Sequence, residues 1–248
     1  MEILGIDIGG SAIKGALVDT IHGVLIGNRL RVETSIDVTP YEHATIVKKM
    51  TCDLSYSGPV GIGFPGPVKN GITWMAANLH KSWVNLNVEA LFRDATGLES
   101  YVLNDADAAG LAELLFGAGK DTQAKVILMS TLGTGIGSAI FVDGHLLPNT
   151  ELGHLEIRGE DAEARASDAA RKLNNWSWKK WTKRLQEYYE TVEKLISPDL
   201  IIIGGGVSKK ADRFLPLLNL KAEIKPAVML NDAGIIGAAL FAEAMVKK

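Results

Sequence analysis

The sequence predicts an α/β protein built from two halves of related design. Leu4 to Asp19 has the pattern of strand, glycine turn and strand, with Gly9-Gly10-Ser11 between two apolar runs. Lys125 to Asp143 repeats this pattern around a second glycine-rich turn. A further echo compares Leu103-Asn-Asp-Ala with Leu230-Asn-Asp-Ala, each of which opens a segment rich in alanine and glycine. Two echoes in the same order favour an internal repeat over a chance likeness of apolar runs.

The composition excludes several classes of protein. The chain has 248 residues, of which 47% are hydrophobic and 22% charged, as expected for one large or two small folded domains. A net charge of -3 argues against a nucleic-acid binder. Cys52 is the only cysteine, which excludes an intrachain disulfide and a cysteine-rich zinc site and favours the cytoplasm. We expect no export signal and no membrane anchor, because no apolar run approaches the roughly 20 residues that span a bilayer.

Local signals predict the remaining elements in order. Thr39-Pro-Tyr-Glu42 has the form of a capping box and begins a helix that runs to about Met50. Asn87 begins another helix, which Gly97 ends. The other predicted elements are strands at 24–34, 59–64, 71–74 and 101–105, helices at 106–116 and 177–195, and a buried strand from 199 that runs into three glycines. Without a low-complexity linker, we expect domains at 1–108 plus 233–248 and at 109–232.

Both glycine turns have the composition of a phosphate-binding site. Gly9 and Gly10 permit backbone angles closed to other residues and leave amides free to face an anion, while Ser11 and Lys14 add a hydroxyl and a positive charge. Asp7 would lie at the strand end, where it could join a hydrated divalent cation to phosphate oxygens. The alternative is an ordinary hairpin with a lone buried acid.

The second turn offers several amides and hydroxyls at one strand end, from Thr131, Gly133, Thr134 and Gly135. Its GxGxG spacing is followed by a strand, so it is not a dinucleotide fingerprint, and the chain has no Walker A loop. Gly204, Gly205 and Gly206 follow a buried strand, where nucleotide bases or phosphates dock. Tight packing explains these three glycines at least as well.

Three polar segments have functional and structural explanations. Asn104-Asp105 lies at a strand end and helix start, where a cap is the simpler explanation. Glu151, His154 and Glu156 place two carboxylates and an imidazole within six positions, which suits the hydroxyls of a sugar. A zinc site competes with this interpretation, but no cysteine or second histidine lies close by, and a surface cluster is a further alternative.

The helix after Ser177 combines an apolar stripe with four basic residues. Trp178, Trp181 and Leu185 have the helical spacing of a core-facing stripe. The four basic residues are Lys179, Lys180, Lys183 and Arg184. They form either a solvated face or the path of a long polyanion. The solvated face is slightly favoured for the helix in isolation.

Read together, six motifs resemble the sugar kinases of the ROK family, within the actin-like ATPase superfamily. They cover essentially the whole chain: Asp7-Ile-Gly-Gly-Ser-Ala-Ile-Lys, Gly63-Phe-Pro-Gly-Pro, Leu103-Asn-Asp-Ala, Leu132-Gly-Thr-Gly-Ile-Gly, Glu151-Leu-Gly-His and Gly204-Gly-Gly-Val-Ser. Within the family, the chain is most similar to the polyphosphate-dependent glucokinases. The segments that carry this likeness are Asn149-Thr-Glu-Leu-Gly-His-Leu-Glu, Ala77-Asn-Leu-His and Ser177-Trp178.

The resemblance implies an actin-like fold of two lobes with a central cleft, glucose in the cleft and the phosphoryl donor across the two glycine hairpins. Asp105 matches the catalytic base, which accepts the proton of the glucose 6-hydroxyl. Asp7 would help hold Mg²⁺. The matching sugar contacts are Asn78, Asn104, Glu151, His154 and, through its backbone, Gly66. Many ROK proteins add a zinc cluster and a glutamate after the Glu-Leu-Gly-His motif; this chain has no cysteine there, and we expect Glu156 to replace that glutamate.

The resulting hypothesis is a cytoplasmic glucokinase that transfers phosphate from inorganic polyphosphate, with ATP as a further candidate donor, to the 6-hydroxyl of glucose. The resemblance also implies a homodimer. With polyphosphate as the donor, the four positive charges of the basic helix favour its interpretation as the path of this long polyanion. The nearest alternative is an ATP-only hexose or N-acetylhexosamine kinase. A sugar-responsive repressor needs a DNA-binding segment ahead of the first hairpin, which here begins at residue 3. An actin-like assembly protein would have no use for Asp105.

Overall fold

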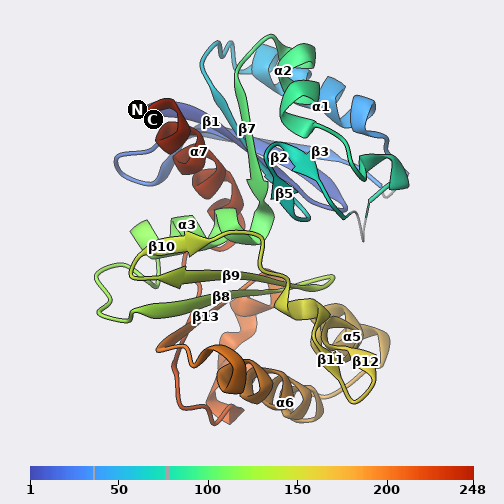
Figure 1. Ribbon diagram of the computed structural model, residues 1–248, viewed down its shortest axis with the longest axis vertical. Coiled ribbons are helices and arrows are strands. Elements are labelled where there is room, and N and C mark those ends of the chain that lie inside the picture. Colours follow the sequence, from blue (N-terminus) through green and yellow to red (C-terminus); the bar gives the residue numbers. More distant parts are fainter. Residues whose placement is uncertain (36, 76–78) are drawn as a thin grey trace. The chain divides into compact units, whose positions relative to one another are not determined.

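The computed structural model describes residues 1–35, 37–75 and 79–248, which form two compact units. Unit 1 comprises Met1–Ala112 and Asp232–Lys248, and unit 2 comprises Glu113–Asn231. Each unit has its own five-stranded sheet (Figure 1). In the part of the chain that the structure describes, no helix is both long enough and apolar enough to cross a membrane.

The sheet of unit 1 begins with the first glycine hairpin. Its strand order is β3-β2-β1-β4-β7. β1 is antiparallel to β2 and parallel to β4, which is in turn parallel to β7. The strands are β1 (Glu2–Ile8), β2 (Ala12–Asp19), β3 (Val24–Glu33), β4 (Val60–Phe64) and β7 (Ser100–Asn104).

Helices cover both faces of this sheet. On one face, α1 (Pro40–Asp53) and α2 (Val88–Thr96) pack over Leu4, Ile6 and Ile62 in one apolar core. On the other face, α7 (Ala233–Val246) lies so close that a Cβ on Gly5 or Gly61 would collide with its backbone. α3 (Asp105–Phe116) crosses α7 equally tightly, because a Cβ on Gly237 would collide with the Ala108 carbonyl. The small residues of the two helices therefore permit their close crossing.

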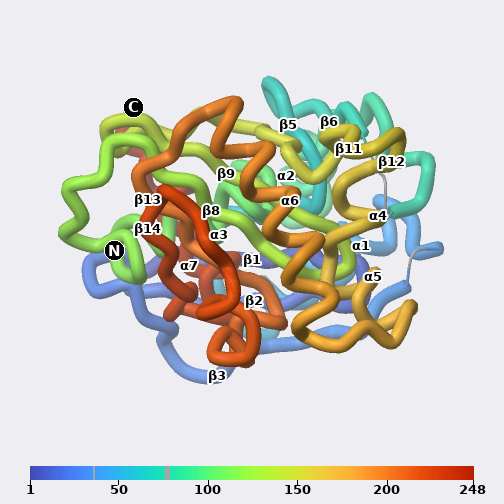
Figure 2. Tube along the Cα trace, turned by 90° about the horizontal axis from the view of Figure 1, so that it is seen from below, coloured from blue at the N-terminus to red at the C-terminus, as the bar shows by residue number. Residues whose placement is uncertain are grey.

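The sheet of unit 2 repeats the arrangement of the first. Its strand order is β10-β9-β8-β13-β14, again a glycine hairpin followed by parallel strands. β13 pairs with β8 on one side and with β14 on the other, and the three strands can be followed in Figure 2. The strands are β8 (Val126–Leu132), β9 (Ile136–Val142), β10 (His145–Leu147), β13 (Leu200–Gly204) and β14 (Glu223–Pro226). The prediction of an α/β chain with duplicated glycine hairpins is confirmed.

The long helix α6 (Trp178–Ile196) anchors the core of unit 2. Its buried stripe contains the predicted Trp181 and Leu185 together with Tyr188, Tyr189 and Val192, whereas the predicted Trp178 is only partly buried. Trp178 and Trp181 also contact Phe214, with ring centroids 6.0 and 5.0 Å apart. The neighbouring helices are α4 (Ala162–Ala166), α5 (Asp168–Leu173) and the 3-10 helix η3 (Gly206–Arg213).

The predicted helix caps are present. Thr39 and Glu42 form the reciprocal capping box of α1, the Asn87 side chain accepts the Ala90 amide, and Gly97 ends α2 with a φ of 75°.

The short elements are β5 (Val68–Lys69), β6 (Ile72–Thr73), η1 (Lys81–Trp83), η2 (Leu152–His154), β11 (Glu156–Ile157), β12 (Glu160–Asp161), η4 (Leu215–Leu217) and η5 (Leu230–Asp232). The predicted strand at 71–74 is thus shorter than expected.

Candidate active site

The first glycine turn, between β1 and β2, carries an ion pair across the hairpin. Asp7 and Lys14 are cross-strand partners, and Lys14 Nζ lies 2.8 Å from Asp7 Oδ2. Both side chains are largely covered, with 15% of Asp7 and 24% of Lys14 exposed. Gly10 and Ser11 are exposed at the tip of the turn. The predicted phosphate-binding residues of unit 1 therefore lie together, with the ammonium already bound by a carboxylate.

The backbone of this turn makes no use of the left-handed angles that glycine permits. Neither Gly9 nor Gly10 has a positive φ. The turn closes through the Gly9 amide, which donates to the Ala12 carbonyl at 3.0 Å. Gly9 is constrained by space instead, because a Cβ there would lie 3.3 Å from the Ala12 carbonyl oxygen.

Asp7 also faces the start of α7. A Cβ on Gly234 would lie 3.0 Å from Asp7 Cγ, so glycine leaves room for the carboxylate at this helix terminus. The unpaired amides of a helix N-terminus favour a negative charge. The strand register pairs Asp7 with Gly63 of β4, and Gly63 with Leu103 of β7. Asp7 and Asn104 are therefore at the same edge of the sheet, where parallel strands end.

Asn104 and Asp105 mark the passage from β7 to α3. Asn104 Oδ1 accepts the Ala106 amide at 2.8 Å and the Asp107 amide at 3.1 Å, so its side chain caps α3. Asp105 is the first residue of the helix, one position earlier than expected, because the cap is Asn104. The capping explanation is thus confirmed for Asn104. Its sugar contact and the role of Asp105 as base stay predictions.

Two further predicted sugar contacts follow β4. The Gly66 amide donates to the Phe64 carbonyl at 2.8 Å, and a Cβ on Gly66 would lie 3.0 Å from the Met75 carbonyl oxygen. The close approach of these two backbone segments favours glycine at position 66. Asn78 lies outside the described residues.

The second glycine turn, between β8 and β9, is met by a carboxylate from another element. The Ile136 amide donates to Glu163 Oε2 at 3.2 Å, and a Cβ on Gly135 would collide with the same oxygen. The Gly133 carbonyl accepts the Ala169 amide of α5 at 3.0 Å. The predicted set Thr131, Gly133, Thr134 and Gly135 therefore forms one turn, with an acidic side chain at its edge.

His154, Asp161 and Glu163 form a cluster beside this turn. His154 Nδ1 lies 2.8 Å from Asp161 Oδ2, while Asp161 Oδ1 accepts the Glu163 amide at 3.1 Å and caps α4. One nitrogen or oxygen of each residue lies within 4.8 Å of the others, so this set could hold a divalent cation. Gly153 fixes the segment against β9, because a Cβ there would collide with the Ile136 carbonyl.

The surroundings of the cluster raise the pKa values of Glu151 and His154. Burial raises the pKa of Glu151, and the negative charge of Glu163 acts in the same direction. The hydrogen bond to Asp161 raises the pKa of His154, and the carboxylates of Glu163 and Glu151 add to this effect. The neighbouring carboxylates therefore favour the charged form of His154. Together, the imidazole and the carboxylates offer the donors and acceptors that sugar hydroxyls need.

Sequence reasoning missed Asp161 and Glu163. Their signal is local, because an aspartate followed two positions later by a glutamate is typical of a helix N-terminus. Glu156, the predicted replacement for the missing glutamate, is exposed on β11. Glu163, by contrast, brings its carboxylate to both the glycine turn and His154.

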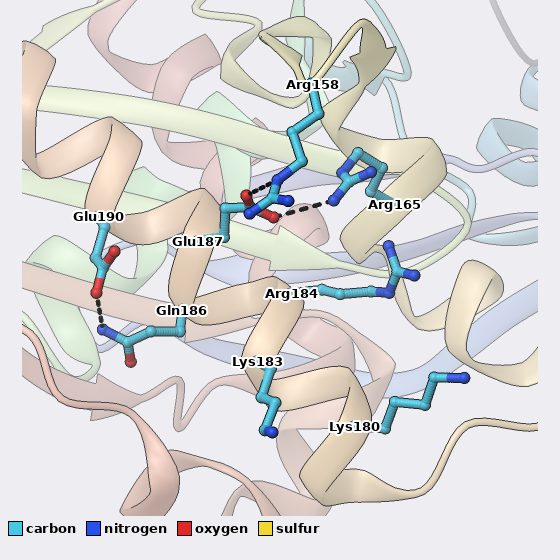
Figure 3. A pocket seen from close by; sticks show the side chains of 8 residues that line it. All are labelled: Arg158, Arg165, Lys180, Lys183, Arg184, Gln186, Glu187 and Glu190. Atoms are coloured by element: carbon cyan, nitrogen blue, oxygen red, sulfur yellow. Dashed lines mark hydrogen bonds and ion pairs between the residues drawn. The ribbon is translucent and has the colours of Figure 1, made fainter.

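Three of the four residues of the predicted basic path line one pocket. Lys180, Lys183 and Arg184 line a pocket of about 550 Å³ together with Arg158 and Arg165, which sequence reasoning missed (Figure 3). Lys179 is not among the residues that line it. A Cβ on Gly205 would collide with the Leu132 carbonyl and one on Gly204 with the Met129 side chain, which favours the packing explanation for these two glycines, whereas a Cβ on Gly206 would meet nothing within 4 Å.

Comparisons with known proteins relate the chain to sugar kinases. The ROK family model matches residues 3–167. The chain is 44% identical to a polyphosphate glucokinase of Mycobacterium tuberculosis over 237 residues, 95% of this chain and 89% of the relative. It is similar to the crystal structure of an inorganic polyphosphate/ATP-glucomannokinase from Arthrobacter sp. strain KM, with 47% identity, a TM-score of 0.94 and coverage of 100% and 99%. A ROK glucokinase from Streptomyces griseus has the same fold, at 21% identity, a TM-score of 0.80 and coverage of 98% and 100%.

Proposed function

The chain belongs to the ROK family and has its actin-like ATPase fold, and from that premise we propose that it is a glucokinase. It transfers a phosphoryl group from inorganic polyphosphate, with ATP as a second donor, to the 6-hydroxyl of glucose. The observation that carries this proposal is the 44% identity to a polyphosphate glucokinase over 95% of this chain. The sugar-suited cluster and the two glycine turns support it.

In the proposed reaction, Asp105 acts as the general base. Its carboxylate takes the proton of the glucose 6-hydroxyl while that oxygen forms a bond to the terminal phosphorus. The bond from this phosphorus to the bridging oxygen breaks, and the donor leaves one phosphate shorter. Because phosphoryl transfer demands mostly positioning and charge neutralisation, a carboxylate in the first turn of α3 suffices as the base.

In the same proposal, the cluster in unit 2 recognises the sugar. Asp161 engages His154 Nδ1, so Nε2 is the nitrogen that meets a sugar hydroxyl. Glu151, whose pKa burial raises, accepts from a sugar hydroxyl when ionised and donates when protonated. Glu163, which lies near His154, is a further acceptor, and Glu156 on β11 stays the predicted replacement for the glutamate of other ROK proteins.

The glycine turns are the proposed phosphate sites. In unit 1 the residues are Gly9, Gly10, Ser11 and Lys14, and in unit 2 they are Thr131, Gly133, Thr134 and Gly135. Asp7 fits the role of a Mg²⁺ ligand, since Mg²⁺ keeps several waters and needs only one or two carboxylates beside the phosphates. The metal would supply charge neutralisation to the donor phosphates. Lys14 already lies against Asp7 and would share that task.

Three further features belong to this proposal. Gly204, Gly205 and Gly206 contact the nucleotide when ATP is the donor. The enzyme is a cytoplasmic homodimer, in keeping with its single cysteine and its family. Its product makes it an entry step to glycolysis.

A donor comparison tests the proposed function. Purified protein is given glucose and Mg²⁺ with long-chain polyphosphate, with ATP or with no donor, and glucose 6-phosphate is measured. We expect turnover with polyphosphate. Turnover with ATP alone would instead identify an ATP-only hexose kinase, and replacing glucose by N-acetylhexosamines tests that alternative. A Asp105→Asn variant is the blank for contaminating kinases.

A further inference from the structure

Five basic side chains line the pocket on α6, called here the basic pocket. It is defined by Arg158, Arg165, Lys180, Lys183, Arg184 and Glu187. Figure 3 shows the two arginines converging on Glu187, while the other three cations extend from the preceding turns of the same helix. The basic pocket thus brings together residues from three separate segments of unit 2.

Only part of this positive charge is compensated. Glu187 accepts hydrogen bonds from both Arg158 and Arg165, the second at 3.0 Å. Among the described residues, no ion pair involves Lys180, Lys183 or Arg184. Arg165 also pairs with Glu160, and the second acidic residue of the lining, Glu190, accepts a hydrogen bond from Gln186. Within the described chain, Lys180, Lys183 and Arg184 are therefore left without an ion pair, one to two turns before Glu187 on α6.

Trp176 orients the unpaired cations. The Arg184 guanidinium lies 4.1 Å from the centre of the Trp176 ring, and Lys180 Nζ lies 5.5 Å from it. A cation held over an aromatic face keeps its full charge while losing side-chain freedom. The residues that line the pocket are all polar or charged, so none of them offers an aromatic platform on which a nucleic-acid base could stack. The arrangement favours a polyanion without bases.

The basic pocket is also tied to the second glycine turn. The five-residue helix α4 carries Glu163, which binds the Ile136 amide, and Arg165, which lines the pocket. Glycine turn and pocket therefore share one short structural support within unit 2. A phosphate chain bound at the second glycine turn would meet the positive charges of the basic pocket where it extends past α4.

We propose that the basic pocket is a second, non-reacting binding site for the polyphosphate donor, which holds phosphates remote from the one transferred. The inference rests on the proposed function, since it concerns the same donor. An exposed site of this kind binds a single phosphate weakly, but a chain already held at its reacting end gains from the second contact through its high effective concentration. Donor length is thus sensed here, and ATP gains nothing from the pocket.

The double variant Lys180→Glu, Lys183→Glu tests this assignment. We expect the KM for long-chain polyphosphate to rise at least about tenfold, with kcat unchanged and with the KM for tripolyphosphate and for ATP nearly unchanged. Loss of two phosphate contacts should also flatten the dependence of log KM on log salt concentration by about 1.4, taking about 0.7 per contact as for single-stranded nucleic acids. The matched control is Lys48→Glu, Lys49→Glu, which changes the net charge equally on exposed positions of α1.

A binding measurement separates this inference from the proposed function. Long-chain polyphosphate is titrated onto wild type and onto the variant without glucose, and weaker binding by the variant supports the pocket even if the wild type proves not to turn over polyphosphate. Equal losses with all three donors would overturn the proposal, and so would a single-stranded RNA that binds the wild type as tightly as polyphosphate. If the charge-reversed protein does not fold, as judged by circular dichroism, Lys180→Gln, Lys183→Gln takes its place.

Discussion

The two glycine hairpins share a scaffold and differ in chemistry. Each begins a five-stranded sheet with the same sequence of antiparallel and parallel pairings. In unit 1 the hairpin supplies its own charges, because Asp7 and Lys14 pair across the strands next to the turn. In unit 2 the hairpin itself is uncharged, and the carboxylate at its edge comes from Glu163 on α4. Duplication thus preserved the backbone and left each half free to acquire its own polar groups.

The second pair of echoes teaches the same lesson. Asn104-Asp105 and Asn231-Asp232 occupy corresponding places in the sequence repeat. Asn104 caps α3 through its side chain, whereas Asp232 pairs with Arg29 at 2.7 Å and makes no side-chain cap. A repeated motif therefore fixes where a residue lies, and the surrounding residues decide what it does.

The largest expected effect separates these two aspartates. Asp105→Asn should lower kcat by about 10²- to 10⁴-fold, the usual contribution of a general base. Asp232→Asn is the matched control from the other copy of the motif, and it should leave kcat nearly unchanged, because a part-exposed ion pair contributes at most about 1 kcal/mol. Steady-state kinetics with glucose and polyphosphate check both. Comparable losses in the two folded variants would remove Asp105 as the base.

The next effect concerns the glycines of the second turn. Gly135→Ala places a methyl group against Glu163 and should lower the free energy of unfolding by about 1–3 kcal/mol, whereas Gly133→Ala has open space and should change it little. Urea unfolding measures both. Adding Glu163→Ala to Gly135→Ala should restore part of the loss, because the collision is then removed. Equal destabilisation by the two glycine variants would show that the turn, and not Glu163, sets the requirement.

A smaller effect is the dependence of stability on pH that the His154–Asp161 pair of unit 2 produces. Because the pKa of His154 is raised in the folded protein by its bond to Asp161, the charged imidazole stabilises the fold below the ordinary pKa of about 6.5 and loses this effect as the pH rises through the raised value. Asp161→Asn should remove that pH-dependent part of the stability and raise the KM for glucose. Thermal unfolding from about pH 5 to about pH 9 and the NMR titration of His154 test it.

The control for Asp161 comes from unit 1. Asp19→Asn removes the carboxylate that lies 2.6 Å from His22 Nδ1 on an exposed hairpin. It should leave both the titration of His154 and the KM for glucose unchanged. An unaltered His154 titration in Asp161→Asn would mean that Glu163 and Glu151, and not the hydrogen bond, raise its pKa.

The smallest effect belongs to the first turn. Lys14→Met leaves Asp7 without its partner and should lower the free energy of unfolding by about 1 kcal/mol or less, since the pair is partly exposed. The loss should shrink in high salt, which screens exposed charges. A loss that exceeds this range and ignores salt would show that the alkyl chain of Lys14 matters for packing.

Patterns short enough to read locally predicted most of the fold. The capping box at Thr39, the Asn87 cap and the Gly97 terminus depend on neighbours in sequence and are confirmed. The repeat was visible because glycine turns and apolar runs recur at corresponding places. The cleft and the lobe boundaries stay predictions.

Contacts between distant segments could not be read in the same way. Arg158 and Arg165 precede Lys183 by 25 and 18 residues in the sequence, and only the folded unit shows that the three side chains line one pocket. Glu163 was missed because its role depends on the space at Gly135. The backbone conformation of the first turn was not predictable either, since glycine permits many angles and the Gly9–Ala12 hydrogen bond closes that turn without a positive φ.

The docking of α7 on the first sheet has a consequence for the order of events during synthesis. Unit 2 is one continuous stretch, whereas unit 1 needs α7, which follows unit 2 along the chain. The ribosome therefore releases the first glycine hairpin early, yet one face of its sheet stays uncovered until α7 emerges. Because Gly234 lies against Asp7, the surroundings of the proposed metal ligand are completed at the same late moment. The half that is made first is the half that finishes folding last.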